Sequence, residues 1–185
     1  GVGAGILLNG GNFEFENLTI AGNISTNGSS GGITFADNYD FVSELILSNS
    51  IVYDNSGDQQ IIFQPNNDPY LITVTYSKIQ GAEDAILTND NGTVIWGDGN
   101  IDADPLFCEP DSGNYHIAGN SPSAGTGFEG ADMGALGVGC DDIWFPPTIA
   151  AMEDTSMDED SELMLQLSAE SDQDYDIYFE AQSDT

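Results

Sequence analysis

Residues 5–24 read GILLNGGNFEFENLTIAGNI, residues 32–51 read GITFADNYDFVSELILSNSI, and residues 60–78 read QIIFQPNNDPYLITVTYSK. The first two stretches start 27 residues apart, and this offset places apolar residues of all three in common columns. Gly5-Ile6 aligns with Gly32-Ile33, and Gly32-Ile33 aligns with Gln60-Ile61 when the offset is one residue longer. The columns that follow are Leu8, Phe35 and Phe63, then Leu18, Leu45 and Ile72, and then Ile20, Leu47 and Val74.

These columns predict strands that stack on one another. Side chains alternate between two faces along a strand, so a pair such as Leu45 and Leu47 points to one face. A repeat of this length cannot bury its apolar face alone and has to stack on its neighbours, which predicts an all-β solenoid with the columns inside. The alternative is an antiparallel sandwich, whose strands would alternate without a fixed repeat length.

The charge of the chain is strongly one-sided. Its 185 residues include 32 acidic residues and a single cation, Lys78, which gives a formal net charge of −31. Nucleic-acid backbones and anionic membrane surfaces are bound through Lys and Arg, so we expect neither partner. No apolar run reaches the length of a membrane-spanning helix, so we expect no membrane insertion. Two explanations of the acidity stay open: a surface adapted to salty water, or divalent-cation sites that cancel part of the repulsion.

Three features bear on export and processing of the chain. Cys108 and Cys140 either close a disulfide, which would stabilise the fold by about 3–4 kcal/mol in the chain-entropy model, or remain buried thiols. Gly1 opens inside the repeat pattern, so we expect a processed product or part of a longer chain. Asn-X-Ser/Thr sequences, which are candidates for glycosylation but are also common in solenoid turns, start at Asn17, Asn23, Asn27 and Asn91.

After Gly92 the repeat gives way to a different pattern. Residues 97–107 read GDGNIDADPLF, and Tyr115-His116-Ile117, a Ser121-Pro122 turn and Asp132-Met133-Gly134-Ala135 follow. In this order the motifs resemble the closing segment of exported bacterial right-handed parallel β-helix repeat proteins, which have a pectate-lyase-like fold. The resemblance implies such a β-helix over residues 1–140, with a C-terminal cap at about residues 92–140 that covers unpaired strand edges.

The last part of the chain has another character. Residues 141–147 contain Pro146-Pro147 and are expected to form a stiff linker. Residues 148–185 are strongly acidic and resemble the first half of a cadherin-like or Ig-like module of bacterial surface proteins, with strands expected at Leu163–Leu167 and Ile177–Ala181. A half module leaves an apolar edge unpaired, so we expect this short β extension to be disordered, docked on the solenoid, or completed by a strand from another chain.

Catalytic chemistry has little support in the sequence. Lyases of the resembled fold pair calcium with an Arg or Lys base, and Lys78 alone could serve here; we expect it to be a solvated lysine at a turn. Hydrolases of this fold use clustered aspartates on adjacent turns of the solenoid. The candidate carboxylates Asp37, Asp40, Asp54 and Asp58 do not recur at the repeat spacing. His116 is expected to be a structural histidine, and we predict no enzyme activity.

Calcium is the better supported ligand, because hard cations prefer several oxygen ligands within a tight loop. One group of candidate ligands is Asp98, Asn100, Asp102 and Asp104 in the cap. The other is Glu159, Asp172, Asp174 and Asp176 in the terminal module, in the order that the resemblance to cadherin-like modules implies. The alternative for both groups is a solvated acidic loop.

The sequence therefore predicts an extracellular or cell-surface structural protein that acts in adhesion and is stabilised by calcium in its acidic loops. The incomplete C-terminal module predicts a homo-oligomer or filament, because an open head-to-tail contact that does not close makes filaments. The competing interpretation is a polysaccharide-binding or polysaccharide-degrading β-helix protein with a glycan partner, although the negative charge disfavours acidic polysaccharides.

Overall fold

The structure, a computed structural model, describes residues 5–25, 30–36, 43–57, 59–65 and 69–145, together with the backbone of residues 148–149 and 169–170. The chain divides into two compact units, Gly1–Ile143 and Trp144–Thr185. In the second unit only residues 144–145 and the antiparallel pair β15 (Thr148–Ile149) and β16 (Ala169–Glu170) are described. The strands expected at Leu163–Leu167 and Ile177–Ala181 lie outside the described residues.

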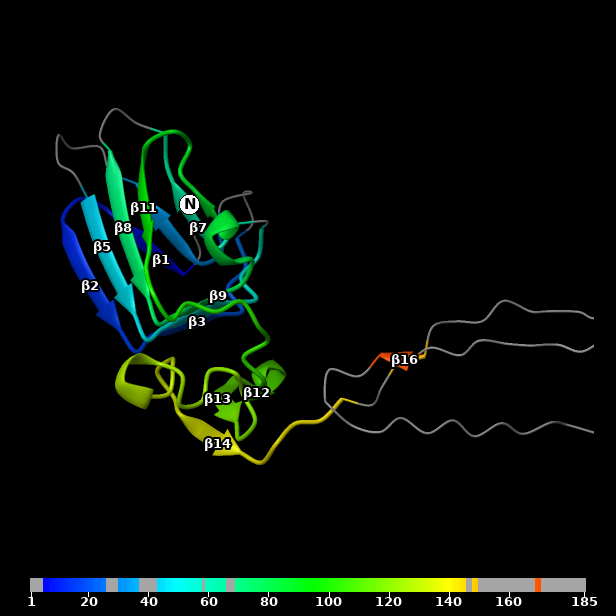
Figure 1. The fold of residues 1–185 in the computed structure, drawn as a ribbon. Helices are drawn as coiled ribbons and strands as arrows, with labels where there is room; N and C mark the ends of the chain where they lie inside the picture. Colours follow the sequence, from blue (N-terminus) through cyan, green and yellow to red (C-terminus); the bar gives the residue numbers. More distant parts are fainter. Residues whose placement is uncertain are drawn as a thin grey trace, which may run out of the picture. The chain divides into compact units, whose positions relative to one another are not determined.

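The first unit is all-β, as predicted, and its described residues contain no α-helix. Three parallel sheets are formed by strands that recur in the same order along the chain, as Figure 1 shows. Sheet A is β1 (Ile6–Leu8), β4 (Ile33–Phe35), β7 (Ile61–Phe63) and β10 (Ile86–Leu87). Sheet B is β2 (Asn12–Glu16), β5 (Ser43–Ser48), β8 (Tyr70–Thr75) and β11 (Gly92–Trp96). Sheet C is β3 (Thr19–Ala21), β6 (Ile51–Tyr53) and β9 (Lys78–Ile79), continued by a parallel bridge from Lys78 to Ile101.

Each passage of the chain through sheets A, B and C is called a rung here, so that β1–β3 form rung 1 and β10, β11 and Ile101 form rung 4. The inner faces of the sheets enclose one core, which we call the inner core. Its columns in sheet A are those that the sequence predicts, because Leu8 pairs with Phe35 and Phe35 with Phe63. Leu45 opposite Ile72 and Leu47 opposite Val74 are also confirmed.

The predicted position of rung 1 in sheet B is wrong. Phe13 and Phe15, not Leu18 and Ile20, lie opposite Leu45 and Leu47. The reason is the longer connection between β4 and β5 in rung 2, which changes the offset from 27 residues in sheet A to 32 in sheets B and C. Leu18 therefore falls at the bend before β3, where its N–H donates to the Ser50 hydroxyl.

Side-chain oxygens connect the rungs at this bend. The N–H of Leu18 donates to Ser50 Oγ, that of Ser50 to Ser77 Oγ, and that of Ser77 to Asn100 Oδ1, over 3.0–3.1 Å. Each rung thus supplies the acceptor that the preceding rung needs at a corner where the ladder of the sheet is interrupted. Such bonds satisfy backbone donors that would otherwise be costly to bury.

Residues 102–143, which we call the side segment, pack against the outer face of sheet C. They contain β12 (Phe107–Glu109), β13 (Asn114–Ala118) and β14 (Val138–Cys140), together with the short 3₁₀ helices η2 (Pro110–Ser112) and η3 (Phe128–Gly130). A further 3₁₀ helix, η1 (Ala82–Ala85), precedes β10. In Figure 1 the side segment lies on one side of β3 and β9, and sheets A and B lie on the other side. Cys108 and Cys140 form a disulfide that joins β12 to β14.

This arrangement differs from the cap expected at about residues 92–140. Gly92–Trp96, expected to open the cap, forms β11, the fourth strand of sheet B. The side segment covers a sheet face rather than the sheet edges: Gly134 N–H donates to Asn49 O and Ala135 N–H to Thr19 Oγ1, at one corner of rungs 1 and 2. Among the described residues, β10 and β11 thus remain edge strands.

A second core, the outer core, lies between sheet C and the side segment. It consists of buried Ile51, Phe107, Ile117 and Met133. Gly134 is required there, because its backbone has φ 92° and a Cβ would lie 2.8 Å from both Ile51 Cδ1 and Thr19 Oγ1. The inner core and the outer core therefore share sheet C, whose residues alternate between them.

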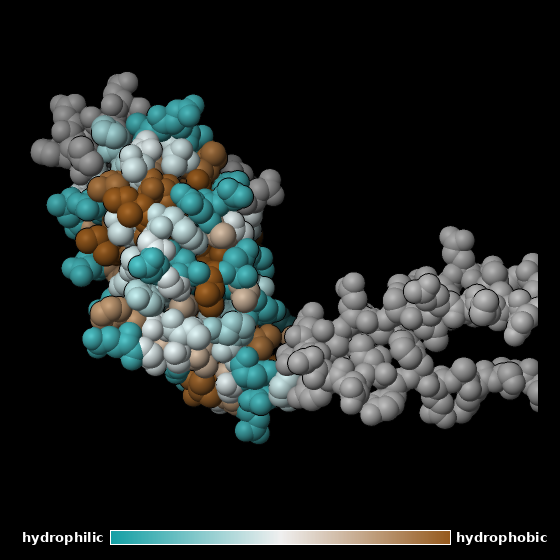
Figure 2. All heavy atoms as spheres, viewed as in Figure 1, coloured by the Kyte–Doolittle hydropathy of each residue, from teal (hydrophilic) through white to brown (hydrophobic). Residues whose placement is uncertain are grey.

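The visible face of the first unit in Figure 2 shows separate brown apolar patches among hydrophilic residues. Ile46 and Ile95, on the outer face of sheet B, are 38% and 48% exposed. Among the described residues, no helix has the length and apolar character that a membrane crossing requires.

Candidate functional site

Lys78, the only cation of the chain, is fully buried between sheet C and the side segment. The prediction of a solvated lysine is therefore wrong. Lys78 follows the bend residue Ser77 and pairs with Ile51, as the repeat predicts, but its side chain points to the outer face of sheet C. The side segment covers that face, which the repeat pattern alone does not reveal.

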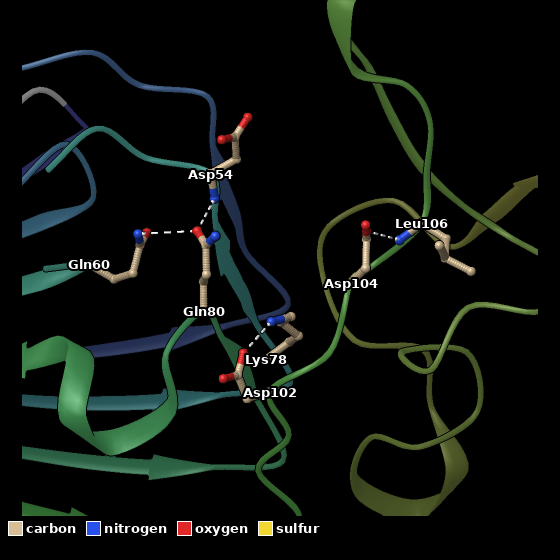
Figure 3. Close-up of polar contacts among 7 residues, drawn as sticks. All are labelled: Asp54, Gln60, Lys78, Gln80, Asp102, Asp104 and Leu106. Carbon is tan, nitrogen blue, oxygen red and sulfur yellow. Dashed lines mark hydrogen bonds and ion pairs between the residues drawn. The ribbon is translucent and has the colours of Figure 1, made fainter. Parts of the chain in front are cut away.

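The ammonium group of Lys78 has two partners. Its Nζ lies 3.0 Å from Asp102 Oδ1, and it also lies 4.6 Å from the centre of the Tyr53 ring. Figure 3 shows Lys78 and Asp102 pointing toward each other. The Asp102 side chain is 45% exposed, so the ion pair joins a buried cation to a carboxylate that water still reaches.

Burial dominates the electrostatics of this cluster. Desolvation lowers the pKa of Lys78 below its ordinary value, although the hydrogen bond and the charge of Asp102 act in the opposite direction. Desolvation raises the pKa of Tyr53, and the charges of Asp104, Asp54 and Asp102 raise it further. Lys78 is thus enclosed between sheet C and the side segment, where Asp102 is the partner of its charge.

A second candidate site is a surface pocket of about 370 Å³ at the corner where the chain leaves sheet C, which we call the corner pocket. Its lining includes Asp54, Asn55, Gln60, Gln80, Gly81 and Asp84. The side chains of Asn55 and Gln60 are buried, whereas Asp54 and Asp84 are exposed. The pocket therefore has a fixed amide wall and an acidic rim.

Hydrogen bonds order the amide wall. Asn55 Nδ2 donates to Gln60 Oε1 over 2.9 Å, and Gln60 Nε2 donates to Gln80 Oε1 over 3.4 Å. The same Gln80 oxygen accepts the N–H of Asp54 over 2.8 Å. Figure 3 shows Gln80 between Gln60 and Asp54.

The first predicted calcium group stays a prediction, and the structure gives its members separate surroundings. Asn100 Oδ1 accepts the N–H of Ser77, Asp102 pairs with Lys78, and Asp104 Oδ1 accepts the N–H of Leu106 over 2.8 Å. Asp98 is exposed at a turn. In the described part of the chain, no group of three or more His, Cys, Asp or Glu side chains is placed to hold a metal ion. The second group, Glu159, Asp172, Asp174 and Asp176, lies outside the described residues.

The remaining candidates have different surroundings. Of the glycosylation candidates, Asn17 is exposed, and Asn27 lies outside the described residues. The side chains of the other two donate hydrogen bonds: Asn23 Nδ2 to Asn55 Oδ1 and Asn91 Nδ2 to Gln64 O. Of the hydrolase candidates, Asp54 lines the corner pocket, and Asp37, Asp40 and Asp58 lie outside the described residues. His116 Nδ1 lies 3.0 Å from Asn114 Oδ1.

Sequence reasoning did not single out Gln60, Gln80 and Asp84 as site residues. Their signal is weak, because amide side chains are common in solenoid turns and only the stacking of rungs 2 and 3 brings Asn55, Gln60 and Gln80 together. Comparisons of this chain with protein-family models, with curated proteins and with solved structures found no match.

Proposed function

We propose that the first unit is a right-handed parallel β-helix that serves as a structural module. Three parallel sheets whose strands recur in the same order support this, because connections between parallel strands of one sheet are right-handed in about 98% of cases. The bonds between rungs at Ser50, Ser77 and Asn100 support it as well, since each of them joins one rung to the next.

The proposed role is an extracellular or cell-surface structural protein that acts in adhesion. The observation that carries this proposal is the burial of Lys78, the only cation of the chain. A lyase-type mechanism needs a basic group that reaches the substrate, and Lys78 is covered by the side segment. The disulfide between Cys108 and Cys140 favours an oxidising compartment, where such bonds persist.

Assembly into oligomers or filaments is the second part of the proposal. It rests on the sequence of residues 148–185, which resembles a half module, and on the edge strands β10 and β11 at one end of the described sheets. Calcium in the acidic C-terminal group would reduce the repulsion between subunits that each carry a formal charge of −31.

The test compares the full chain with a chain that lacks residues 148–185. Light scattering and electron microscopy of the full chain, with and without calcium, should show assemblies larger than a monomer. The shortened chain should remain monomeric and keep its β-sheet circular dichroism. Equal assembly of both chains, or a full chain that stays monomeric in all conditions, would contradict the proposed assembly.

A polysaccharide-binding role is the second candidate, and the corner pocket favours it. Carboxylates and amides at a concave site are suited to hydroxyl groups, and the negative charge disfavours acidic glycans. Polysaccharide cleavage has no comparable support, because no described carboxylates are shown to form a pair with catalytic spacing.

A further inference from the structure

The corner pocket is built around an aspartate in a position where the neighbouring rungs have glycine. Gly22 lies opposite Asp54, to whose carbonyl it donates its N–H over 3.1 Å, and the register of β6 with β9 continues from Asp54 to Gly81. All three have left-handed backbones, with φ of 66°, 52° and 81°. This conformation costs a non-glycine residue about 1–2 kcal/mol, and aspartate is one of the residues that adopt it most readily.

The glycines have a second effect on this corner. Because Gly22 and Gly81 carry no side chain, the Asp54 carboxylate has no neighbour in its own column on either side. Asp84, in η1, supplies the other carboxylate of the pocket. Both side chains are exposed, and neither carboxylate has a hydrogen-bond partner among the described residues. Within the described part of the chain, the pocket therefore offers two acceptor groups that no other residue uses.

The amide wall lines the same pocket and includes a further donor. Gln80 Oε1 accepts two hydrogen bonds, from Asp54 N and Gln60 Nε2, which fixes the orientation of the amide. Its Nε2 has no partner among the described residues. Gln60, which holds Gln80, is only 4% exposed and is held in turn by Asn55. A preformed donor of this kind loses little entropy when a ligand binds.

These groups together select one kind of ligand. A metal ion or an ammonium group could satisfy the carboxylates but could not accept a hydrogen bond from Gln80 Nε2. An anionic ligand could accept that bond but would be repelled by Asp54 and Asp84. A hydroxyl group both donates and accepts. We infer that the corner pocket binds a neutral sugar residue, whose neighbouring hydroxyls donate to Asp54 and Asp84 and accept from Gln80. The volume of about 370 Å³ lies in the range of small-molecule sites.

This inference rests on the second candidate function and narrows its ligand to a neutral sugar. It is independent of the proposed assembly, since it uses no residue beyond Ala85. The test measures binding of glucose, galactose, mannose and N-acetylglucosamine to the full chain by saturation-transfer NMR and calorimetry. Calcium chloride, spermidine and glucuronic acid are separate arms that represent a metal ion, an ammonium ligand and an anionic sugar. At least one neutral sugar should bind, and glucuronic acid should bind about tenfold more weakly or not at all.

The decisive variant is Asp54→Gly, which removes the carboxylate and gives rung 2 the glycine that rungs 1 and 3 have. It should keep or raise the melting temperature and weaken sugar binding by about tenfold or more. Asp90→Gly is the matched control, because Asp90 is also an exposed aspartate with a left-handed backbone, φ 56°, but lies outside the pocket. It should bind sugar like the natural chain.

Asp84→Ala provides a second route to the same result without a change at the rung corner. The inference is overturned if no neutral sugar binds, if only calcium or spermidine binds, or if both Asp54→Gly and Asp84→Ala bind sugar with unchanged affinity. Loss of assembly in the chain that lacks residues 148–185 would leave these outcomes unaffected, so the two proposals fail separately.

Discussion

The two faces of sheet C carry two cores that are built in different ways. On the inner face, Ile20, Val52 and Ile79 continue the aliphatic columns of the rungs. On the outer face, Ile51 packs with Phe107, Ile117 and Met133 from a segment that does not repeat, and Lys78 is buried on the same face. The first core is a stack of equivalent layers, whereas the second is a single contact closed by one disulfide. From this difference we expect the side segment to loosen without unfolding of the rungs.

The largest effect is expected in the inner core. Phe63 is fully buried, with ring centres 4.6 Å from Phe35 and 5.3 Å from Tyr70. Phe63→Ala should lower the free energy of unfolding by about 3–5 kcal/mol, because it removes a large side chain from a closely packed site. Urea unfolding monitored by circular dichroism measures this loss.

The control for Phe63→Ala is Ile95→Ala, at a position that is 48% exposed on sheet B. It should change the free energy of unfolding by less than about 1 kcal/mol. Equal losses for the two variants would show that the predicted interior of the rungs is not a core.

Removal of the disulfide should act on the outer core alone. The bond between Cys108 and Cys140 closes a separation of 32 residues, and its loss should cost about 3–4 kcal/mol in the chain-entropy model. In the Cys108→Ser/Cys140→Ser chain, hydrogen exchange should speed up in β12, β13 and β14. Protection of β5 and β8 should remain. Loss of protection in all sheets together would mean that the two cores form one cooperative unit.

Two substitutions of Lys78 separate the effect of its side-chain volume on stability from the effect of its charge. Lys78→Ala should lower the free energy of unfolding by about 2–4 kcal/mol, because it leaves a cavity in the outer core. Lys78→Met keeps most of the side-chain volume and should change the free energy of unfolding by less than about 1.5 kcal/mol. The reason is that the desolvation of a buried ion pair offsets much of its attraction, and Asp102 stays hydrated. A large loss for Lys78→Met, measured by urea unfolding at pH 7, would show that the ion pair itself holds the side segment.

The smallest expected effect is the pH dependence of stability that Lys78 and Tyr53 cause. Because burial lowers the pKa of Lys78, the unfolded chain binds a proton that the folded chain lacks between that lowered pKa and the ordinary value near 10.5. The contribution of Lys78 to stability should therefore rise with pH through this window. Tyr53, with a raised pKa, should act in the opposite direction above pH 10.

The difference in free energy of unfolding between the natural chain and Lys78→Met isolates the lysine from the tyrosine. That difference should shift in favour of the natural chain as the pH rises from 8 to 10. A flat difference, or a shift in favour of Lys78→Met, would contradict the lowered pKa of Lys78.

The contrast between the cores also explains what could be predicted from the sequence. Columns such as Leu8, Phe35 and Phe63 were predicted because each rung repeats the same local pattern. Rung 1 in sheet B was misplaced because a longer connection in rung 2 changes the offset in sheets B and C but not in sheet A, so that Phe13 and not Leu18 lies opposite Leu45. The burial of Lys78 could not be predicted from the repeat, since it depends on a non-repeating segment packing on sheet C.

For the candidate sites too, the sequence does not show which residues the stacking of the rungs brings together. The spacing of Asp98, Asn100, Asp102 and Asp104 predicts a calcium loop, but Asn100 and Asp102 are used by rung 3, through Ser77 and Lys78. The corner pocket, in contrast, arises from residues that are unremarkable in sequence. Asp54 becomes distinctive only when the stacking of the rungs places it between Gly22 and Gly81.

The most direct test of the two-core account is a nuclear Overhauser spectrum of the full chain with assigned side chains. The account predicts contacts between the rings of Phe35 and Phe63, whose centres lie 4.6 Å apart, together with contacts from the Ile51 Cδ1 methyl to the backbone of Gly134. Absence of the first contact would contradict the stacked rungs, and absence of the second in the oxidised chain would contradict the covered outer face of sheet C.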